Sequence, residues 1–369
     1  MVRRLLAALL CALLLNGCAS APEEAPTGAA RPIGHMQLQY AEQFSVDYYA
    51  GGASLATIAG EKRYLLVPEG AEAPEIEDAT VLHTPLSHIY LASSGAMDPF
   101  CKLDALDAVR FTGTAAADWS LPEVADALNA GEILYAGKYR APDYELLLAE
   151  GCSFAIENTM ILHSPATREQ LEALGIPTMV ERSSYESHPL GRMEWIKLYA
   201  LLVGKEAEAE AFFESQTAAL RGVLGAESTG KTAAFFYWNP GGYVNVRRPG
   251  DYLSKMIELA GGVYVPAETG AEDSALSTMN MQLEAFYAAA KDADVLFYNG
   301  NIYPVDSLAQ LIAASELFAD FRAVQNGDVW ATEQNVFQET CAVGGMIADF
   351  HAVLSGTAAE ELTYLHKLN

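Results

Sequence analysis

The sequence has few basic residues for its length. Its 369 residues include 22 lysines and arginines but 48 aspartates and glutamates, which gives a formal net charge of −26. Proteins that bind nucleic acid need clustered basic side chains that neutralise phosphates and release counterions. We therefore expect no nucleic-acid partner, and the acidic surface mainly indicates a soluble folded body. A few arginines gathered in one place could still bind an anionic ligand.

The sequence also lacks the cysteine spacing of a metal site and the motifs of common enzymes. After residue 18 the cysteines are Cys101, Cys152 and Cys341, an odd number without a CxxC pair. Cys101 and Cys152 either pair with each other or are buried as small apolar residues. No GxSxG elbow, P-loop or HExxH helix is present, and no arrangement of serine, histidine and aspartate predicts a triad. We expect a protein that is not an enzyme and has no intrinsic cofactor.

Long apolar runs are absent except near the N-terminus. Residues 5–15 are apolar and follow Arg3 and Arg4. This run is too short to cross about 30 Å of hydrocarbon as a helix, so it predicts a signal peptide over residues 1–17. The run ends in Leu-Asn-Gly-Cys18, which resembles the lipobox of bacterial lipoproteins, where the cysteine is lipidated. The alternative is an ordinary secretory signal with a chance cysteine.

The residues that follow Cys18 predict a flexible tether. Residues 18–35 have few apolar side chains to bury, and Pro22 and Pro26 interrupt regular structure. We expect lipid on Cys18 to hold the protein at the extracytoplasmic face of the cell membrane, on the periplasmic side if the host has an outer membrane. The remaining residues exceed one comfortable core, which favours two domains.

The first half of the body alternates strand-like and helix-like segments. We expect strands at residues 64–68, 81–82, 109–113, 133–135, 153–156 and 176–180. We expect helices at residues 121–129, 142–150 and 167–174, and the start of another at residues 88–92. This alternation predicts a mainly parallel sheet covered by helices.

A long helical segment then separates the two halves. Residues 191–224 lack proline and are rich in alanine, glutamate, leucine and lysine, with aromatic residues at roughly helical spacing. The segment predicts one long helix, interrupted or not, and the alternative is two helices with a turn at Gly204. After Gly225 the alternation resumes, with strands at residues 232–238, 294–298 and 329–331 and helices at residues 252–260, 283–291, 308–314 and 346–354.

Several segments, taken in order, resemble one known family. They are Leu174-Gly-Ile-Pro177 before a strand, Pro189-Leu-Gly-Arg-Met-Glu-Trp-Ile-Lys197 at the start of the long helix, Ala260-Gly-Gly262, and Phe321-Arg-Ala-Val-Gln-Asn-Gly-Asp-Val-Trp330. Together with the lipobox, the chain resembles the solute-binding lipoproteins of ABC importers for ferric siderophores, haem and cobalamin. The resemblance implies two Rossmann-like α/β lobes, over residues 36–188 and 226–369, joined by a single long helix over residues 189–225.

The resemblance also implies partners. A member of this family captures a metal chelate between its lobes, docks onto an ABC permease and its ATPase through one acidic residue on each lobe, and acts as a monomer. Glu145 and Glu284 match those positions, because each opens a helix that leads through a polar turn into a buried strand and then an asparagine. Otherwise each is a solvated carboxylate that favours a helix N-terminus.

Aromatic residues and arginines near predicted strand ends are candidates for ligand binding. Flat aromatic faces suit a large, partly apolar chelate, and phenols add hydrogen bonds. A forked guanidinium can hold a carboxylate or catecholate through two hydrogen bonds, although it can also form a surface ion pair. The candidates are Tyr90, Tyr139, Arg140, Arg182 and Tyr185 in the first lobe, and Trp238, Tyr243, Arg247, Tyr298 and Tyr303 in the second.

Other ligands remain open at this point. A ferric siderophore or similar chelate is the main expectation, and cobalamin, another corrinoid or haem is the closest alternative. His83, His88, His163 and His188, with Glu157 or Glu181, could instead form a zinc or manganese site, although their spacing matches no recognised ligand set. A sensory or adhesion lipoprotein without transport function is a further alternative.

Overall fold

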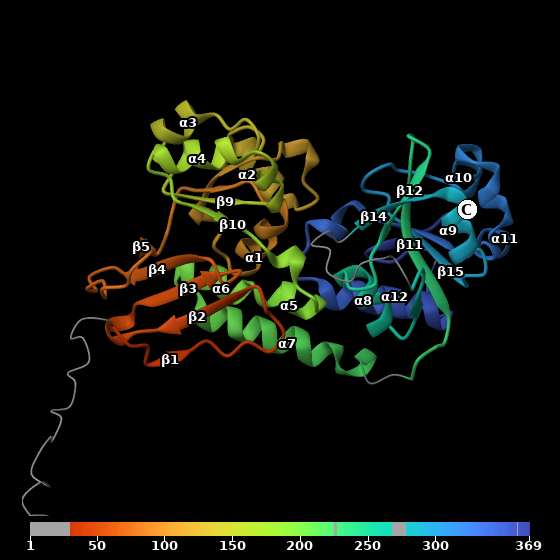
Figure 1. Ribbon diagram of the computed structural model, residues 1–369, viewed down its shortest axis with the longest axis horizontal. Coiled ribbons are helices and arrows are strands. Elements are labelled where there is room, and N and C mark those ends of the chain that lie inside the picture. Colours follow the sequence, from red (N-terminus) through yellow and green to blue (C-terminus); the bar gives the residue numbers. More distant parts are fainter. Residues whose placement is uncertain (1–29, 225–226, 268–277, 360) are drawn as a thin grey trace, which may run out of the picture.

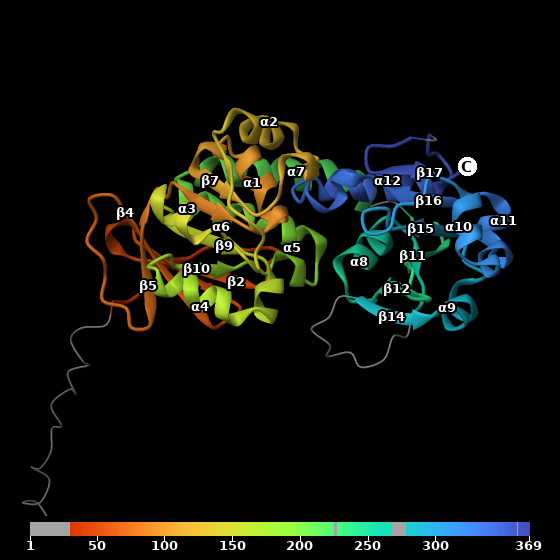
Figure 2. The same cartoon turned by 90° about the horizontal axis from the view of Figure 1, so that it is seen from above.

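The chain folds into two α/β lobes that lie side by side and are joined by helices along one side (Figure 1). The view turned by 90° shows the same separation (Figure 2). This computed structural model describes residues 30–224, 227–267, 278–359 and 361–369. The predicted signal peptide, Cys18 and most of the predicted tether lie outside the described residues. The predicted fold of two α/β lobes with parallel sheets is confirmed.

The first lobe is built on a parallel five-stranded sheet in the order β10-β9-β6-β7-β8. Its strands are β6 (Ile89–Leu91), β7 (Val109–Thr112), β8 (Leu134–Tyr135), β9 (Phe154–Glu157) and β10 (Thr178–Val180). The helices between them are α1 (Met97–Lys102), α2 (Pro122–Ala130), α3 (Tyr144–Ala149) and α4 (Pro165–Ala173). Proline opens α2 and α4, where its missing N–H costs no helical hydrogen bond. This part of the predicted alternation is therefore confirmed.

One predicted helix is wrong. Within residues 88–92, Ile89–Leu91 form strand β6 at the centre of the sheet, and all three residues are fully buried. A central strand of a parallel sheet is covered on both faces, so it has a continuous apolar run without the alternation of a half-exposed strand. The run is too short for its periodicity to distinguish a strand from the start of a helix.

A second sheet, most of which was not predicted from sequence, precedes the parallel one. Its order is β1-β2-β3-β4-β5, antiparallel except between β4 and β5. Its strands are β1 (Gly34–His35), β2 (Phe44–Tyr48), β3 (Ser54–Ile58), β4 (Lys62–Pro68) and β5 (Ala79–Thr84). Phe44, Val46 and Ile58 pack into the same core as α6 and the parallel sheet. Gly34 and His35, assigned to the tether from sequence, are thus part of the folded body.

The connecting segment consists of three consecutive helices, α5 (Pro189–Glu194), α6 (Ile196–Val203) and α7 (Glu206–Leu224). Gly204, with φ of 70°, ends α6 in the left-handed conformation that glycine adopts at low cost. The interruption at Gly204 is therefore real, and α7 alone is the long helix. Its Ala209 packs into the core of the first lobe, whereas Phe213 and Leu220 pack into the core of the second. Helix α7 thus connects both lobes (Figure 1).

The second lobe has a mixed sheet in the order β14-β12-β11-β15-β16-β17, with β13 paired to β11. Its strands are β11 (Thr232–Asn239), β12 (Tyr243–Arg247), β13 (Val263–Tyr264), β14 (Thr278–Gln282), β15 (Val295–Tyr298), β16 (Val329–Thr332) and β17 (Leu365–Lys367). Its helices are α8 (Tyr252–Leu259), α9 (Leu283–Ala290), α10 (Leu308–Ala314), α11 (Arg322–Asn326) and α12 (Val343–Ser355). Strands β11, β15 and β16 are parallel as predicted, while antiparallel β12, β14 and β17 were not predicted.

Candidate ligand site at the junction of the lobes

Loops that follow parallel strands of the two lobes meet at one junction. The Thr340 hydroxyl, in the segment after β16, donates a 2.7 Å hydrogen bond to the Gly95 carbonyl after β6. Gln338 accepts from the Ser120 N–H at 2.6 Å and donates to the Asp118 carbonyl at 2.8 Å, both in the segment after β7. The carboxyl ends of parallel strands from both lobes therefore face this junction. Ligands of open α/β sheets bind at such edges.

Asp98 fastens the junction from the first lobe. Its carboxylate is fully buried and accepts the Cys341 N–H at 2.7 Å, and Lys102 lies 3.4 Å from its other oxygen. Burial raises the pKa of Asp98, while the Cys341 N–H and the Lys102 ammonium oppose that rise. The contact holds the start of α1 against the segment that leads into α12.

Arg192 occupies the centre of this junction. It lies on α5, and its guanidinium carbon is 4.5 Å from the centroid of the Tyr252 ring. The guanidinium also lies close to Gly95, because a Cβ built on that glycine would lie 3.1 Å from Nη2. Its Nε is buried and has no hydrogen-bond partner among the described residues. From sequence, Arg192 was noted only as part of the helix-opening motif. A basic residue between two halves of so acidic a chain could have indicated a ligand-binding role.

Arg247 approaches the same aromatic ring from the second lobe. Its guanidinium carbon is 5.9 Å from the Tyr252 centroid and 5.5 Å from the Phe337 centroid. Its Nη1 lies 3.4 Å from a carboxylate oxygen of Asp251, whose side chain is fully buried. Burial acts to lower the pKa of Arg247, but the charges of Asp251, Tyr252 and Tyr264 and the hydrogen bond to Asp251 together outweigh burial and raise that pKa. Arg192 and Arg247 thus both approach the Tyr252 ring, and Asp251 forms an ion pair with Arg247.

Two further predicted arginines each lie over a neighbouring tyrosine in the first lobe. The Arg182 guanidinium carbon, after β10, is 5.3 Å from the Tyr185 centroid. The Arg140 guanidinium carbon, after β8, is 5.5 Å from the Tyr139 centroid. A guanidinium over an aromatic face is held by the charge distribution of the ring and keeps its N–H groups free to donate. Both pairs lie at the carboxyl edge of the parallel sheet.

The predicted aromatic residues of the second lobe gather near the ends of β11 and β15. The Tyr237 and Tyr303 ring centroids are 5.9 Å apart, and Trp238 packs edge-on against Phe318. Tyr303 is exposed, and Tyr243 lies directly opposite Asn239 in the β11–β12 hairpin. These rings provide flat, accessible surface at the same sheet edge.

Two candidates are core residues. The Tyr90 and Tyr298 rings are fully buried, in a core of the first lobe and of the second lobe respectively. The Tyr90 hydroxyl donates to the Gly137 carbonyl at 3.0 Å, and the Tyr298 hydroxyl donates to the Tyr303 carbonyl at 2.7 Å. Each therefore supports a loop that carries another candidate, Tyr139 or Tyr303. Burial raises the pKa of both phenols.

The candidate metal residues are dispersed. His83, His88 and His163 are exposed on different elements, while the His188 ring stacks on Tyr40 at 4.5 Å. Burial lowers the pKa of His188. Within the described ranges, no group of three or more His, Cys, Asp or Glu side chains could hold a metal ion. Cys101, Cys152 and Cys341 are all free thiols, so the possible Cys101–Cys152 disulfide is not formed.

The two predicted docking glutamates lie on different lobes. Glu145 is exposed in the first turn of α3, and Glu284 is exposed in the first turn of α9. Each carboxylate is therefore accessible at a helix N-terminus, where the helix dipole favours a negative charge. Among the described residues, no helix is long and apolar enough to span a membrane.

Comparison with known proteins assigns the chain to a family. The sequence model of the periplasmic binding protein family matches residues 99–336. The chain belongs to the periplasmic binding protein family. Two uncharacterized lipoproteins of Methanocaldococcus jannaschii are similar to this periplasmic binding protein. One is 24% identical over 361 residues, with 91% of this chain and 88% of the relative covered, and the other is 23% identical, with 74% and 66% covered.

Solved structures show the same fold at low identity. A periplasmic haem-binding protein of Pseudomonas aeruginosa has a TM-score of 0.59 and 15% identity, covering 77% of this chain and 98% of that one. A protein of the Fe3+-hydroxamate transport system of Saccharomonospora viridis has a TM-score of 0.57 and 20% identity, covering 73% and 93%. The vitamin B12-binding protein of Vibrio cholerae has a TM-score of 0.51 and 16% identity, covering 74% and 98%.

The family confirms the resemblance stated from sequence. It also confirms the predicted location outside the cytoplasm, and the two lipoprotein relatives agree with the predicted lipid anchor. Cys18 itself lies outside the described residues. Because structural neighbours at this identity share only the fold, the ligand has to be argued from the residues of this chain.

Proposed function

We propose that this periplasmic binding protein captures an anionic metal chelate, most simply a ferric siderophore, between its lobes and delivers it to an ABC permease. The observation that carries the proposal is the pair Arg192 and Arg247, which approach the Tyr252 ring from different elements at the junction. The chain as a whole has a net charge of −26, which repels anions. Two arginine side chains close together at the junction would locally offset that negative potential and attract an anionic ligand. A guanidinium pair of this kind binds carboxylate or catecholate oxygens through charge-assisted hydrogen bonds.

Aromatic surface at the same sheet edges supports a large chelate. Tyr139 and Tyr185 in the first lobe, and Trp238, Tyr243 and Tyr303 in the second, are partly or largely exposed. Their faces would pack on the organic part of a chelate while Arg140, Arg182, Arg192 and Arg247 bind its anionic groups. Tyr90 and Tyr298 would not contact the ligand. Their hydroxyl groups would hold the loops that carry Tyr139 and Tyr303 in place through hydrogen bonds.

Delivery would use one carboxylate on each lobe and the lipid anchor. Glu145 and Glu284 are proposed to dock on basic residues of the permease, which works with its ATPase. Lipid on Cys18 would keep the binding protein, acting as a monomer, close to the permease and raise its effective concentration there. This is a binding and transport function rather than an enzymatic one.

The test is a ligand panel on the full chain extracted in detergent, followed by quenching of tryptophan fluorescence. The panel contains a trianionic ferric tris-catecholate, a neutral ferric tris-hydroxamate, haemin, cyanocobalamin, zinc and manganese. The proposal predicts tightest binding of an anionic chelate. Loss of one buried charged hydrogen bond costs about 1.5–3 kcal/mol, so Arg192→Gln should weaken that binding roughly tenfold or more. Arg322→Gln, at an exposed ion pair with Asp294, is the matched control and should have no effect.

A chain that binds only zinc or manganese would contradict the proposal, as would one that binds nothing in the panel. The first result would favour a bare-metal carrier, and the second a sensory or adhesion lipoprotein. Equal binding by Arg192→Gln and wild type would remove the junction as the site.

Haem or a corrinoid is the second candidate, favoured by exposed apolar side chains beside the strand ends. Met160 and Leu162 follow β9 and are 49% and 43% exposed, and Ile302 and Tyr303 follow β15 and are 50% and 40% exposed. Large apolar side chains exposed in pairs suit the faces of a macrocycle. If haemin or cyanocobalamin binds most tightly, replacing Met160 and Ile302 by serine should weaken it, whereas a tris-catecholate should tolerate both changes.

A further inference from the structure

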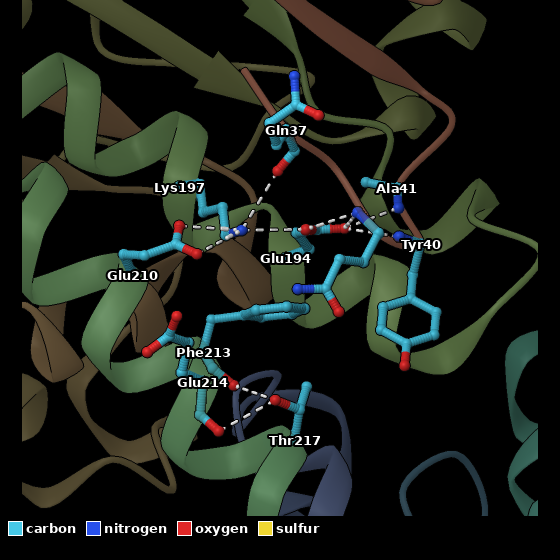
Figure 3. A network of polar contacts seen from close by, with 10 residues as sticks. Gln37, Tyr40, Ala41, Glu194, Lys197, Glu210, Phe213, Glu214 and Thr217 are labelled. Carbon is cyan, nitrogen blue, oxygen red and sulfur yellow. Dashed lines mark hydrogen bonds and ion pairs between the residues drawn. The ribbon is translucent and has the colours of Figure 1, made fainter.

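A short N-terminal segment crosses the connecting helices and is held there by buried carboxylates. We call residues 37–43 the strap. Glu194, at the end of α5, accepts the Gln39 N–H at 2.9 Å, the Tyr40 N–H at 2.8 Å and the Ala41 N–H at 3.0 Å (Figure 3). Three successive backbone donors thus converge on one side chain. The strap has no regular secondary structure whose carbonyl groups could accept these N–H hydrogen bonds. The Glu194 carboxylate accepts them instead.

The charge of Glu194 is balanced inside the protein. Its carboxylate is fully buried, and the Lys197 ammonium lies 3.2 Å from Oε1. Lys197 is itself 4% exposed and lies 3.0 Å from Glu210 and 3.4 Å from the Gln37 carbonyl. A buried charge with this many partners is costly to disrupt, because the partners that remain lose their compensation.

A second buried carboxylate repeats the arrangement at the other end of the strap. Glu186 accepts the Glu42 N–H at 2.7 Å and the Gln43 N–H at 3.0 Å. It also accepts the indole N–H of Trp195 at 2.7 Å, which joins it to the break between α5 and α6. Glu194 on α5 and Glu186, just before α5, therefore clamp five consecutive residues of the strap, 39–43.

The strap contacts both lobes. Leu38 and Ala41 pack against the core of the first lobe, whereas the Tyr40 ring packs against the core of the second and stacks on His188. Its fit on α5 is tight, because a Cβ added at Gly191 would lie 2.8 Å from the Tyr40 carbonyl oxygen. The strap therefore fixes α5 against both lobes.

Arg192 lies on the same helix between these contacts. At 3.6 residues per turn, side chains two positions apart point about 200° away from each other. Glu194 faces the strap, so Arg192 faces away from it, toward Gly95 and Tyr252 at the junction. We infer that Glu194 is a positioning residue for the ligand site, which clamps the strap on α5 and thereby holds Arg192 between the lobes. This inference rests on the proposed function, and the strap lies outside the residues that the family model matches.

The test replaces Glu194 by glutamine and measures binding of the ferric tris-catecholate to the full chain. Glutamine keeps the size of the side chain, but it removes the charge facing Lys197 and turns an amide toward backbone N–H donors. Affinity should fall about tenfold, within the range for residues that act through a contacting neighbour. Glu210→Gln is the matched control, because it removes the other carboxylate bound to Lys197 without touching the strap.

Two further variants separate positioning from general damage. Gly191→Ala leaves every charge in place and only pushes the Tyr40 carbonyl away from α5. It should therefore weaken binding of the tris-catecholate as Glu194→Gln does. If Glu194→Gln does not fold, Gly191→Ala still tests the inference. Amide exchange at residues 39–41 should rise in both variants. Combined with Arg192→Gln, the Glu194→Gln change should cost no further affinity, because its effect passes through Arg192.

The failures are distinguishable. A wild-type chain that binds none of the chelates contradicts the proposed function and the inference with it. A wild-type chain that binds the tris-catecholate, with Glu194→Gln and Gly191→Ala unchanged in affinity, overturns the inference alone. The inference is also overturned if the loss of affinity in the Arg192→Gln, Glu194→Gln double variant equals, to within about twofold, the product of the losses in the two single variants.

Discussion

Glu157, the last residue of β9, should make the stability of the folded protein depend on pH. Its side chain is fully buried, and neither carboxyl oxygen has a hydrogen-bond partner in the described part of the chain. Burial alone raises its pKa from 4.5 to about 8, because water can no longer solvate the charged form. The folded protein therefore keeps this group protonated at neutral pH, while the unfolded chain ionises it.

The sign of the effect follows from proton binding. Below about pH 4.5 both states are protonated, so the full stability is present there. Between pH 4.5 and 8 the unfolded state binds fewer protons, and stability falls as pH rises. At about 1.4 kcal/mol per unit, the shift corresponds to a loss of about 5 kcal/mol across this window, and about 3 kcal/mol by pH 7.

Glu157→Gln should remove this loss, since the amide does not titrate. Urea unfolding of the two proteins at pH 5, 6, 7 and 8 checks it, and the variant should gain on the wild type at each step upward. The other buried acids are present in both proteins, so their contribution to the pH dependence cancels in the difference between the two unfolding free energies. Glu169→Gln, at an exposed position of α4, is the control and should run parallel to the wild type. Parallel curves for Glu157→Gln as well would refute the burial argument.

Three further predictions test the junction, the docking residues and the hinge. Asp98→Ala leaves the Cys341 N–H buried without an acceptor, so it should lower the free energy of unfolding by about 1–3 kcal/mol and speed amide exchange at Cys341. Unchanged exchange at Cys341 would show that the contact is not made in solution. Reversing charge at Glu145 and Glu284 should abolish uptake in cells while leaving ligand affinity intact, and normal uptake would remove their docking role. Gly204→Ala, at φ of 70°, should destabilise the protein by about 1–2 kcal/mol in thermal unfolding, and an equal melting temperature would mean that the turn relaxes.

Much of the fold could be predicted because its signals are local. Pro122 at the start of α2, Gly175 after α4 and the buried run of β15 each mark an element through its own residues. The N-terminal sheet was largely missed because β1 has only two residues and β3 is buried almost throughout, so it lacks the alternation of exposed and buried residues that marks a strand. Residues 88–92 were misassigned because a buried central strand has no periodicity to read.

The candidate site was predictable by residue type but not by geometry. Arg182 and Tyr303 do follow strands, as predicted, whereas Arg247 is the last residue of β12, which runs antiparallel to β11. Burial of Tyr90 depends on how helices cover the sheet, which no local pattern records. Arg192 was overlooked as a ligand residue because its role arises from α5 lying between the strap and the junction.

We propose that an anionic chelate binds at the guanidinium pair between the lobes. The most direct test of this proposal compares the dissociation constant of the ferric tris-catecholate for the wild type with that for a variant in which Arg192 and Arg247 are both glutamine. We expect measurable binding to the wild type and a loss of affinity of about a hundredfold or more in the variant. Equal affinity in the two proteins, or no binding to either, would contradict it.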